Sequence, residues 1–323
     1  MLNGILIVRK EQGYTSNDVV AKLRGICRQK KIGHTGTLDP NATGVLPVCL
    51  GNATKLCGML TDRSKEYIAR LTLGITTDTQ DIWGQVLSDS GGRWRKIPEE
   101  KIEEVVASFR GRQQQIPPMY SALKVNGKRL YELARAGVEI ERAPREIEIE
   151  EIELLPPEGC PEGTERRAAY FSDLPELHIR VACSKGTYIR TICQDIGEKL
   201  GCGAAMSALV RTRVGGFLLE NAHTLSEIEQ IRDAERLTSV LIPVDACFEG
   251  CPAFEVLEGG QRFLKNGNEL KCSMVRGRDG EVFPADMPVE TPVRIYDGEG
   301  VFYGVYRVWQ DGKTLRPWKM FLP

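Results

Sequence analysis

Apolar and polar residues alternate along several short stretches of the chain, which is the pattern of strands with one buried face. This alternation predicts strands at residues 66–74, 147–155 and 177–184, and a short apolar run predicts another at residues 4–8. Apolar residues at helical spacing predict helices at residues 16–24, 51–60, 98–109 and 130–136, and a further helix after residue 187. Strands and helices mixed without a regular strand–helix repeat favour an α+β fold over a doubly wound sheet.

The pattern changes after about residue 248, where short alternating strands are separated by turns rich in Gly, Asp and Asn. That spacing predicts a small all-β domain. We therefore expect a larger domain at residues 1–248 and a smaller one at residues 249–323. Residues 156–175 are rich in Pro, Gly and Glu, so we expect a loop insertion there.

The composition is that of a soluble globular protein, with 41% apolar and 27% charged residues in a chain of 323. No apolar run approaches the roughly 20 residues that a membrane-spanning helix needs. The first ten residues contain too short an apolar stretch for a signal peptide and no small-residue cleavage site. These features predict a cytoplasmic protein that makes no membrane contact.

The ten cysteines and three histidines form no recognisable ligand set. The cysteines are scattered, no Cys-x-x-Cys pair occurs, and the histidines lie near no pattern of ligand spacing. In a reducing compartment such thiols are mostly small buried hydrophobic side chains. The chain also lacks the signatures of dinucleotide and P-loop nucleotide binding. We expect no structural metal and no cofactor.

The net charge of −1 does not indicate a nucleic-acid-binding protein, but the local charge does. Residues 22–31 carry five basic residues and no acid, and we expect the helix that begins at residue 16 to continue through them. Residues 120–135 carry four basic residues against one glutamate. Such clusters suit phosphate contact, although most charge runs simply face solvent. The residues that we expect to contact an RNA backbone are Arg24, Arg28, Lys30, Lys31, Lys124, Lys128 and Arg129.

Residues 31–48 are the most unusual stretch of the chain. They hold three glycines, two prolines and a single carboxylate, Asp39. Glycine opens backbone conformations that other residues avoid, and Pro40 disfavours a helical conformation at Asp39. We expect an irregular loop that presents Asp39 and His34, and neither a helix nor a regular strand. By itself, an Asp-Pro pair is a common structural turn.

Within this stretch, the run GHTGTLDPNATGVLP at residues 33–47 closely resembles the catalytic loop of the TruB family, the bacterial tRNA pseudouridine-55 synthases. The resemblance implies that Asp39 is the nucleophile. The segment CSKGTYIRT at residues 183–191 resembles a second motif of the family. In that motif the family's arginine pairs with the nucleophile and its tyrosine lines the uridine pocket. These residues are Arg190 and Tyr188 here.

A third match, LVRTRVGGF at residues 209–217, places the family's apolar pocket wall at Leu209. The resemblance extends over nearly the whole chain. It implies the pseudouridine synthase fold, with a mixed and largely antiparallel central sheet flanked by helices and loops. Segments FLKNGN at residues 263–268 and VRIYDGEGVFYGV at residues 293–305 resemble the family's C-terminal PUA-type RNA-binding domain.

The same resemblance suggests four further site residues. Tyr67 corresponds to the family's active-site tyrosine, which stacks on the uracil and is a candidate for proton transfer at C5; a core strand tyrosine is the alternative. His34 corresponds to the residue that fills the space of the flipped nucleotide. Asp81 is a polar candidate beside the site or a simple turn cap. Lys10 matches a family lysine, but Glu11 follows it where family members often have proline.

The chemistry implied by the family needs no cofactor. The N1–C1′ bond of uridine breaks, the base turns, and a new bond joins C5 to C1′. One carboxylate nucleophile suffices, and it attacks either C1′ of the ribose or C6 of the base. A nearby arginine such as Arg190 favours the ionised carboxylate. Flipping the base out of a folded loop costs roughly a few kcal/mol, and an aromatic face returns about 1–3 kcal/mol.

The sequence thus predicts an enzyme that isomerises uridine 55 in the T loop of tRNA. Its expected partner is the T-arm stem-loop, and we expect a monomer that needs no protein partner. Two alternatives share these features. One is a guide-RNA-dependent pseudouridine synthase, and the other is a non-catalytic RNA-binding or RNA-folding protein. The presence of Asp39, Tyr67 and Arg190 together disfavours the second alternative.

Overall fold

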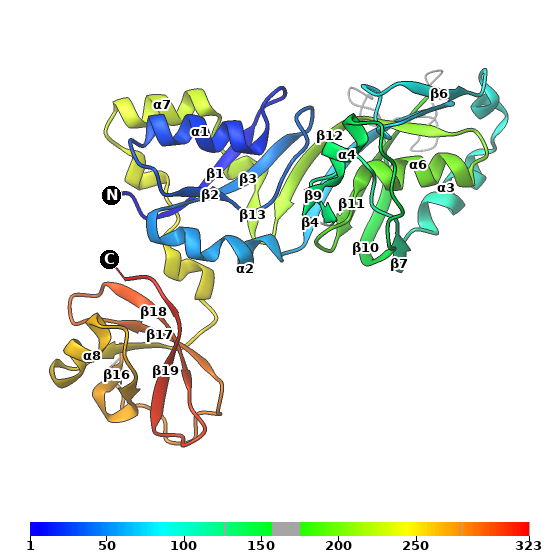
Figure 1. The fold of residues 1–323 in the computed structure, drawn as a ribbon. Coiled ribbons are helices and arrows are strands. Elements are labelled where there is room, and N and C mark those ends of the chain that lie inside the picture. Colours follow the sequence, from blue (N-terminus) through cyan, green and yellow to red (C-terminus); the bar gives the residue numbers. More distant parts are fainter. Residues whose placement is uncertain (126, 157–174, 279, 323) are drawn as a thin grey trace.

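The computed structural model describes residues 1–125, 127–156, 175–278 and 280–322, and it contains two large sheets (Figure 1). The larger sheet has the strand order β1-β3-β12-β4-β11-β10-β7, with β2 paired to β3 and β13 paired to β12. All of these pairs are antiparallel except β3 with β12. The strands are β1 (Gly4–Lys10), β2 (Ile32–His34), β3 (Thr43–Leu50), β4 (Lys65–Leu73), β7 (Gly111–Gln115), β10 (Arg145–Leu155), β11 (Glu176–Cys183), β12 (Ala204–Val214) and β13 (Phe217–Leu218).

One half of this sheet is covered on both faces. Helices α1 (Ser16–Ile26) and α7 (Leu225–Asp233) lie over one face of β1 and β3 (Figure 1), and together they bury a shared apolar cluster. The segment η1 (Gly51–Leu56) and helix α2 (Cys57–Thr61) pack on the opposite face. Helix α1 begins at a capping box between Thr15 and Asp18, which satisfies otherwise free backbone N–H groups.

The other half of the sheet is covered on one face only. Helices α3 (Glu99–Ala107) and α6 (Ile189–Lys199) pack on the apolar face of β4, β10 and β11. The alternation along β4 sends every second residue into this cluster. The opposite face is polar, where Arg180 donates to Glu153 at 2.8 Å, Glu151 at 2.9 Å and Glu66 at 3.0 Å. The α+β prediction is therefore confirmed, and the open face explains the charged half of the alternating pattern.

Smaller elements lie beside this sheet. Strands β5 (Ile75–Thr77) and β6 (Val86–Asp89) form one hairpin, and β8 (Lys124–Val125) and β9 (Lys128–Arg129) form another. Helix α4 (Leu130–Arg135) follows β9, and a short helical turn η2 (Arg93–Lys96) precedes α3.

The second sheet has the order β15-β19-β18-β17-β14-β16. Its strands are β14 (Ala253–Val256), β15 (Leu270–Lys271), β16 (Val275–Gly277), β17 (Pro292–Tyr296), β18 (Phe302–Val308) and β19 (Thr314–Met320), and it carries the short helix α8 (Gln261–Lys265). The two termini lie close together in Figure 1. The predicted small β domain is thus present, with one short helix that the sequence pattern did not indicate.

The second sheet packs against the first through a shared apolar cluster. Phe248 lies in the segment η5 (Val244–Phe248), and its ring centroid is 6.3 Å from that of Phe302 and 6.0 Å from that of Phe321. Asn52 donates from Nδ2 to the backbone oxygen of Phe321 at 3.0 Å, and Lys55 donates to that of Met320 at 2.8 Å. The boundary after residue 248 stays a prediction.

Most predicted elements are present, but several strands of the larger part of the chain were not predicted, among them β7, β12 and the short hairpin strands β5, β6, β8 and β9. The expectation that residues 31–48 contain no regular strand is wrong, because β2 and most of β3 fall within them. Residues 45–50 are fully buried in the centre of the molecule, and such a strand shows no alternation. The helix predicted at residues 51–60 begins as a 3₁₀ segment and continues as α2. The predicted insertion at residues 156–175 lies, except for its two end residues, outside the described residues.

Two further features concern the whole chain. None of the helices in the described ranges has the length and apolar character needed to cross a lipid bilayer. The nine cysteines that the structure describes carry free thiols, of which four are fully buried.

Gly197 tests how tightly α6 packs on the sheet. In an unconstrained helix, replacement of Gly by Ala stabilises by about 1 kcal/mol. Here a Cβ would lie 2.1 Å from the backbone nitrogen of Ala204 in β12, so the helix would have to move. We expect Gly197→Ala to lower the free energy of unfolding by about 1–3 kcal/mol in urea titrations. The neighbouring exposed change Glu198→Ala is the control, and equal stability of Gly197→Ala and wild type would contradict this packing argument.

Candidate active site

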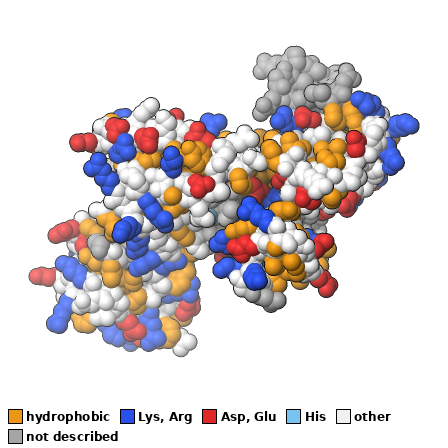
Figure 2. All heavy atoms as spheres, turned by 45° about the horizontal axis from the view of Figure 1, so that its top comes forward, with side chains coloured by type: hydrophobic (Ala, Val, Ile, Leu, Met, Phe, Trp, Pro, Cys, Tyr) orange, Lys and Arg blue, Asp and Glu red, His pale blue; other side chains and the backbone are white. Residues whose placement is uncertain are grey.

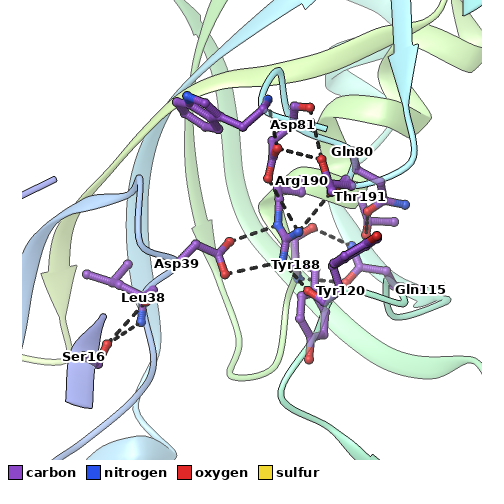
Figure 3. A network of polar contacts seen from close by, with 12 residues as sticks. Ser16, Leu38, Asp39, Gln80, Asp81, Gln115, Tyr120, Tyr188, Arg190 and Thr191 are labelled. Carbon is purple, nitrogen blue, oxygen red and sulfur yellow. Dashed lines mark hydrogen bonds and ion pairs between the residues drawn. The ribbon is translucent and has the colours of Figure 1, made fainter. Parts of the chain in front are cut away.

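The loop between β2 and β3 carries Asp39 and is held at several points. The Leu38 N–H donates to Ser16 Oγ on α1 at 2.9 Å (Figure 3). The Ala42 N–H donates to the backbone oxygen of Asp39 at 3.1 Å. The Leu38 and Ala42 side chains are buried in the apolar cluster under α6. The Asp39 side chain remains 38% exposed. The predicted irregular loop is therefore real but shorter than expected, and it presents one carboxylate.

Lys10 holds this loop from below. Its side chain is 1% exposed, and Nζ donates to the backbone oxygens of Ala42 at 2.5 Å, Pro40 at 3.0 Å and Glu11 at 3.1 Å. Burial lowers the pKa of Lys10 to about 8, although the charge of Asp39 acts in the opposite direction. Since all these donor contacts go to backbone, the geometry assigns Lys10 to the support of the loop; the predicted contact with substrate is untested.

Arg190 joins the loop to helix α6. Its Nε lies 2.9 Å from Asp39 Oδ2, and its Nη2 donates to Asp39 Oδ1 at 3.4 Å (Figure 3). The remaining donors meet the Thr79 oxygen at 3.0 Å and the Tyr120 oxygen at 2.7 Å. Because the Arg190 side chain is only 6% exposed, these partners compensate a buried charge and fix the guanidinium. The predicted pairing of Arg190 with Asp39 is thus present in the geometry.

Asp81 lies on the far side of Arg190. Its Oδ2 is 3.7 Å from Arg190 Nη1, and its Oδ1 accepts from Thr79 Oγ1 at 2.7 Å and from the Trp83 N–H at 3.2 Å. Burial raises the pKa of Asp81, while these hydrogen bonds and Arg190 lower it. Asp81 therefore caps its turn and is also the second carboxylate that contacts Arg190. The sequence had suggested these two positions, a turn cap or a polar residue beside the site, as alternatives.

The turn that carries Asp81 is pinned to β12. Gln80 has a positive φ of 65°, which is uncommon for a residue other than glycine. Its Oε1 accepts from Thr191 Oγ1 at 2.8 Å, and its backbone oxygen accepts from the Met206 N–H at 3.0 Å. The register of β12 against β4 shifts between Met206 and Ala208, next to this contact. These contacts hold the strained turn in place beside α6.

Tyr67 and Leu209 lie on neighbouring strands of the central sheet. In the register of β4 with β12, Leu209 is opposite Ala69 and Tyr67 is opposite Arg211. Both side chains belong to the buried cluster that also contains Leu38, with Tyr67 8% and Leu209 7% exposed. Burial raises the pKa of the Tyr67 phenol, against the attraction of the Arg211 guanidinium. The structure therefore places the predicted tyrosine and leucine together beneath the Asp39 loop.

Tyr188 is the N-cap residue of α6 rather than part of its first turn. Its N–H donates to Gln115 Oε1 at 2.8 Å, and its backbone oxygen accepts from Gln115 Nε2 at 3.0 Å, which ties the helix to the end of β7 (Figure 3). The phenol is half-buried, and this burial raises its pKa. These contacts fix Tyr188 at the start of the helix that carries Arg190. That its side chain lines a uridine pocket stays a prediction.

His34 lies at the end of β2, half-buried. Its Nδ1 accepts from the Gly36 N–H at 3.3 Å. Burial and the nearby charge of Arg211 both lower the pKa of His34. The imidazole is therefore neutral near pH 7 and can pack against a base without carrying a charge into the site.

All seven residues predicted to contact an RNA backbone are exposed. Helix α1 ends at Ile26, so Arg28, Lys30 and Lys31 lie in the turn that follows it and not on a helix that runs to residue 31. Arg24 braces this turn, since its Nε donates to the Lys30 oxygen at 3.2 Å. The other three lie on the β8–β9 hairpin. Figure 2 shows basic side chains mixed with acidic ones on the face in view, so a one-sided field stays a prediction.

Residues outside the predicted set also build the site. Thr79 and Tyr120 accept from Arg190 through their backbone oxygens, and Gln115 binds the backbone of Tyr188 through its side-chain amide. A sequence motif does not reveal such contacts. Arg211 is different, because it is a charged residue inside the third matched motif and is 1% exposed. Among the described residues, no three His, Cys, Asp or Glu side chains gather in an arrangement that could hold a metal ion.

The site can be compared with known proteins. A relative from Lachnoclostridium phytofermentans, "tRNA pseudouridine synthase B", is 49% identical over 99% of this chain and 100% of its own. A protein of the same description from Syntrophomonas wolfei is 41% identical over 99% of each chain. The chain therefore matches these relatives over their full length.

Solved structures share the fold. The protein in "Crystal Structure of a Cbf5-Nop10-Gar1 Complex" is 26% identical, with a TM-score of 0.67 over 99% of this chain and 85% of that one. "Structure of H/ACA RNP bound to a substrate RNA containing 2'-deoxyuridine" matches with a TM-score of 0.66 at 23% identity, over 99% and 85% of the two chains. The predicted pseudouridine synthase fold, with a C-terminal PUA-like β domain, is confirmed.

Two family descriptions match successive parts of the chain. Residues 24–189 match "TruB family pseudouridylate synthase (N terminal domain)" and residues 190–249 match "tRNA pseudouridylate synthase B C-terminal domain". The matched range contains the Asp39 loop, Tyr67, Asp81 and the Arg190 motif. The chain belongs to the TruB family of pseudouridylate synthases.

Proposed function

We propose that this chain converts uridine 55 in the T loop of tRNA to pseudouridine, with Asp39 as the nucleophile. The observation that carries the proposal is the pairing of a partly exposed Asp39 carboxylate with a buried Arg190 through two contacts, at 2.9 and 3.4 Å. The fixed guanidinium orients the carboxylate, which stays partly exposed to solvent, where a base can enter. The relatives named tRNA pseudouridine synthase B support tRNA as the substrate.

The reaction is an isomerisation, and its bonds balance within the substrate. Asp39 attacks C1′ or C6, the N1–C1′ bond breaks, and the C5–C1′ bond forms after the base turns. The proton lost from C5 is balanced by the proton gained at N1. Tyr67 is the proposed group for this transfer because it lies beneath the Asp39 loop in the same buried cluster.

The walls of the pocket are proposed to receive the flipped base. Tyr67 and Leu209 form its apolar floor, and Tyr188 lies beside it at the start of α6. The neutral imidazole of His34 occupies the space that the base leaves in the stacked loop. Aromatic contact of this kind returns about 1–3 kcal/mol per base, which is comparable to the cost of flipping.

The exposed basic residues are proposed to bind phosphates around the T-arm. Arg28, Lys30 and Lys31 directly precede the strand that leads into the Asp39 loop, so phosphates beside the flipped nucleotide are within their reach. The smaller domain, residues 249–323, is proposed to hold a more distant part of the tRNA. Its fixed packing against Phe248 and Asn52 keeps it at a constant distance from Asp39.

A guide-RNA-dependent enzyme is the second candidate. Solved structures with this fold include a Cbf5-Nop10-Gar1 complex and an H/ACA RNP bound to a substrate RNA, but the matched chains are only 26% and 23% identical to this one. The relatives at 41–49% identity match this chain from end to end. We therefore propose that the chain acts as a monomer without a guide RNA or a protein partner.

The nucleophile is tested by Asp39→Asn in the purified chain, with a tRNA transcript and no other component. Asparagine keeps the shape but lacks the nucleophilic anion, so we expect pseudouridine formation to fall below detection while tRNA binding stays within about threefold. The control is Asp62→Asn, which removes an exposed carboxylate paired with Lys185 at 2.8 Å. Wild-type chain that fails on the transcript, or Asp39→Asn that turns over normally, would contradict the proposal.

The turn after α1 is tested by neutralising Arg28, Lys30 and Lys31 together with Gln. If they bind phosphates near the flipped base, affinity for whole tRNA and for the isolated T-arm stem-loop should fall together. The slope of log affinity against log salt should decrease by roughly 0.7–0.9 for each lost contact. An unchanged slope, measured by fluorescence anisotropy, would mean that the turn only faces solvent.

The role of the smaller domain is tested at Lys265, Lys271 and Lys313, which are exposed around β15. Replacing them with Gln should weaken binding of whole tRNA but leave binding and turnover of the T-arm stem-loop unchanged, because that substrate does not reach the domain. Replacing the equally exposed acids Glu258 and Glu269 with Gln is the matched control. Equal losses on both RNA substrates would rule out this division between the domains.

A further inference from the structure

Arg211 has the largest side chain among the described residues that are less than 2% exposed. An arginine stays charged in proteins, so its burial is costly unless its donors are satisfied. Within the described parts of the chain, its donors meet backbone oxygens rather than a carboxylate. A buried cation held in this way is unusual, and its partners show what it stabilises.

Those partners lie on both sides of Asp39. The Nε of Arg211 donates to the Val45 oxygen at 2.7 Å, Nη2 donates to the Gly36 oxygen at 3.3 Å, and Nη1 lies 3.5 Å from the Thr37 oxygen. Gly36 and Thr37 precede Asp39, and Val45 follows it at the start of β3. One planar guanidinium therefore bridges the two ends of the catalytic loop.

The backbone of Arg211 meets the loop as closely as its side chain does. Arg211 is paired in register with Gly44 on β3, in the single parallel pair of the larger sheet. A Cβ on Gly44 would lie 2.2 Å from the Arg211 oxygen, and the φ of Gly44 is +110°, so only glycine fits. The end of the loop therefore meets Arg211 through both its backbone and its side chain.

The charge of Arg211 also faces the titratable groups of the site. These are Lys10 on β1, His34 on β2, Tyr67 and Lys65 on β4, and they lie close enough for its charge to lower their pKa values. The negative charge of Asp39 acts in the opposite direction on the pKa values of Tyr67 and Lys10. Arg211 thereby keeps the interior behind the loop positive while the exposed side presents the carboxylate.

We propose that Arg211 is a positioning residue for the reaction, whose forked guanidinium holds the two ends of the Asp39 loop together before RNA binds. Lys10 secures the apex of the loop at Pro40 and Ala42, and Arg211 secures its base. A lysine at position 211 could not replace the fork, because one ammonium cannot span the carbonyls of residues 36, 37 and 45 in the same geometry. This inference rests on the proposed function of Asp39.

The experiment compares Arg211→Lys and Arg211→Met with Arg213→Lys in the full-length chain. Arg213 lies two residues along the same strand, but its Nη1 binds the Gly215 oxygen at 3.3 Å and Ser64 Oγ at 3.5 Å, away from the loop. The wild-type chain and the three variants are first checked for folding by circular dichroism and for binding to the T-arm stem-loop. Single-turnover rates are then measured at saturating RNA across pH 5–9.

We expect both Arg211 variants to react about 10–100-fold more slowly than wild type at unchanged RNA affinity, because a small displacement of the nucleophile is costly. Arg213→Lys should react at the wild-type rate. Arg211→Lys at the wild-type rate, or an equal loss in Arg213→Lys, would overturn the proposal. Unfolding of both Arg211 variants while Arg213→Lys folds would also overturn it, since Arg211 would then serve the framework of the sheet.

Two readouts do not depend on catalysis. Amide hydrogen exchange of residues 36–45 should be faster in the Arg211 variants and unchanged in Arg213→Lys. The pKa of His34, measured by NMR, should rise in Arg211→Met, where the cation is lost, and stay near the wild-type value in Arg211→Lys. If the wild-type chain made no pseudouridine at all, the function of Asp39 would fail, while loop exchange would still report on Arg211.

Discussion

The ion pair between Asp39 and Arg190 joins two parts of the chain that are 151 residues apart. Arg190 is buried, and removing one partner of a buried pair typically costs about 3–5 kcal/mol. The guanidinium is therefore held by two carboxylates and two backbone oxygens, which come from the loop, the Asp81 turn and the segment before β8. Each of these segments is irregular, and the single cation fixes them relative to α6.

A loop rich in glycine cannot hold a carboxylate in place by its own hydrogen bonds. Glycine loses more conformational freedom on ordering than other residues do, so the ordered loop must be stabilised from outside. In this chain Lys10 and Arg211 bind its backbone oxygens from the buried side, while Leu38 and Ala42 fill the apolar cluster beneath it. Asp39 is the carboxylate that this loop leaves partly exposed.

The two sheets share an apolar interior. Phe302 and Phe321 pack with Phe248 in the cluster that also contains Ile5 and Ile7 of β1. For an enzyme that must hold a large folded RNA, such an interface fixes the distance between two binding surfaces. A flexible linker would leave that distance variable and would add an entropic cost to binding both surfaces at once.

The sequence by itself determined the α+β class, the small C-terminal β domain and the family, and it singled out the residues of the candidate site. Alternation identified β4, β10 and β11 because each has one apolar face, and the long rare motifs identified Asp39 and Arg190. It did not identify β3 and β12, since strands buried on both faces lose the alternation that marks a strand. It also placed Arg28, Lys30 and Lys31 on a helix, although the helix ends at Ile26.

Only the tertiary structure decided which residues support the site. The side-chain amide of Gln115 binds the backbone of Tyr188, and Tyr120 accepts from Arg190 through its backbone oxygen. Arg211 binds backbone oxygens of a loop that lies more than 160 residues earlier in the chain. Backbone oxygens are the same at every position, so no sequence pattern marks the ones that a distant cation will bind. The motif that singles out Asp39 is therefore local information, whereas the position of its carboxylate depends on how β3, β12 and α6 come together.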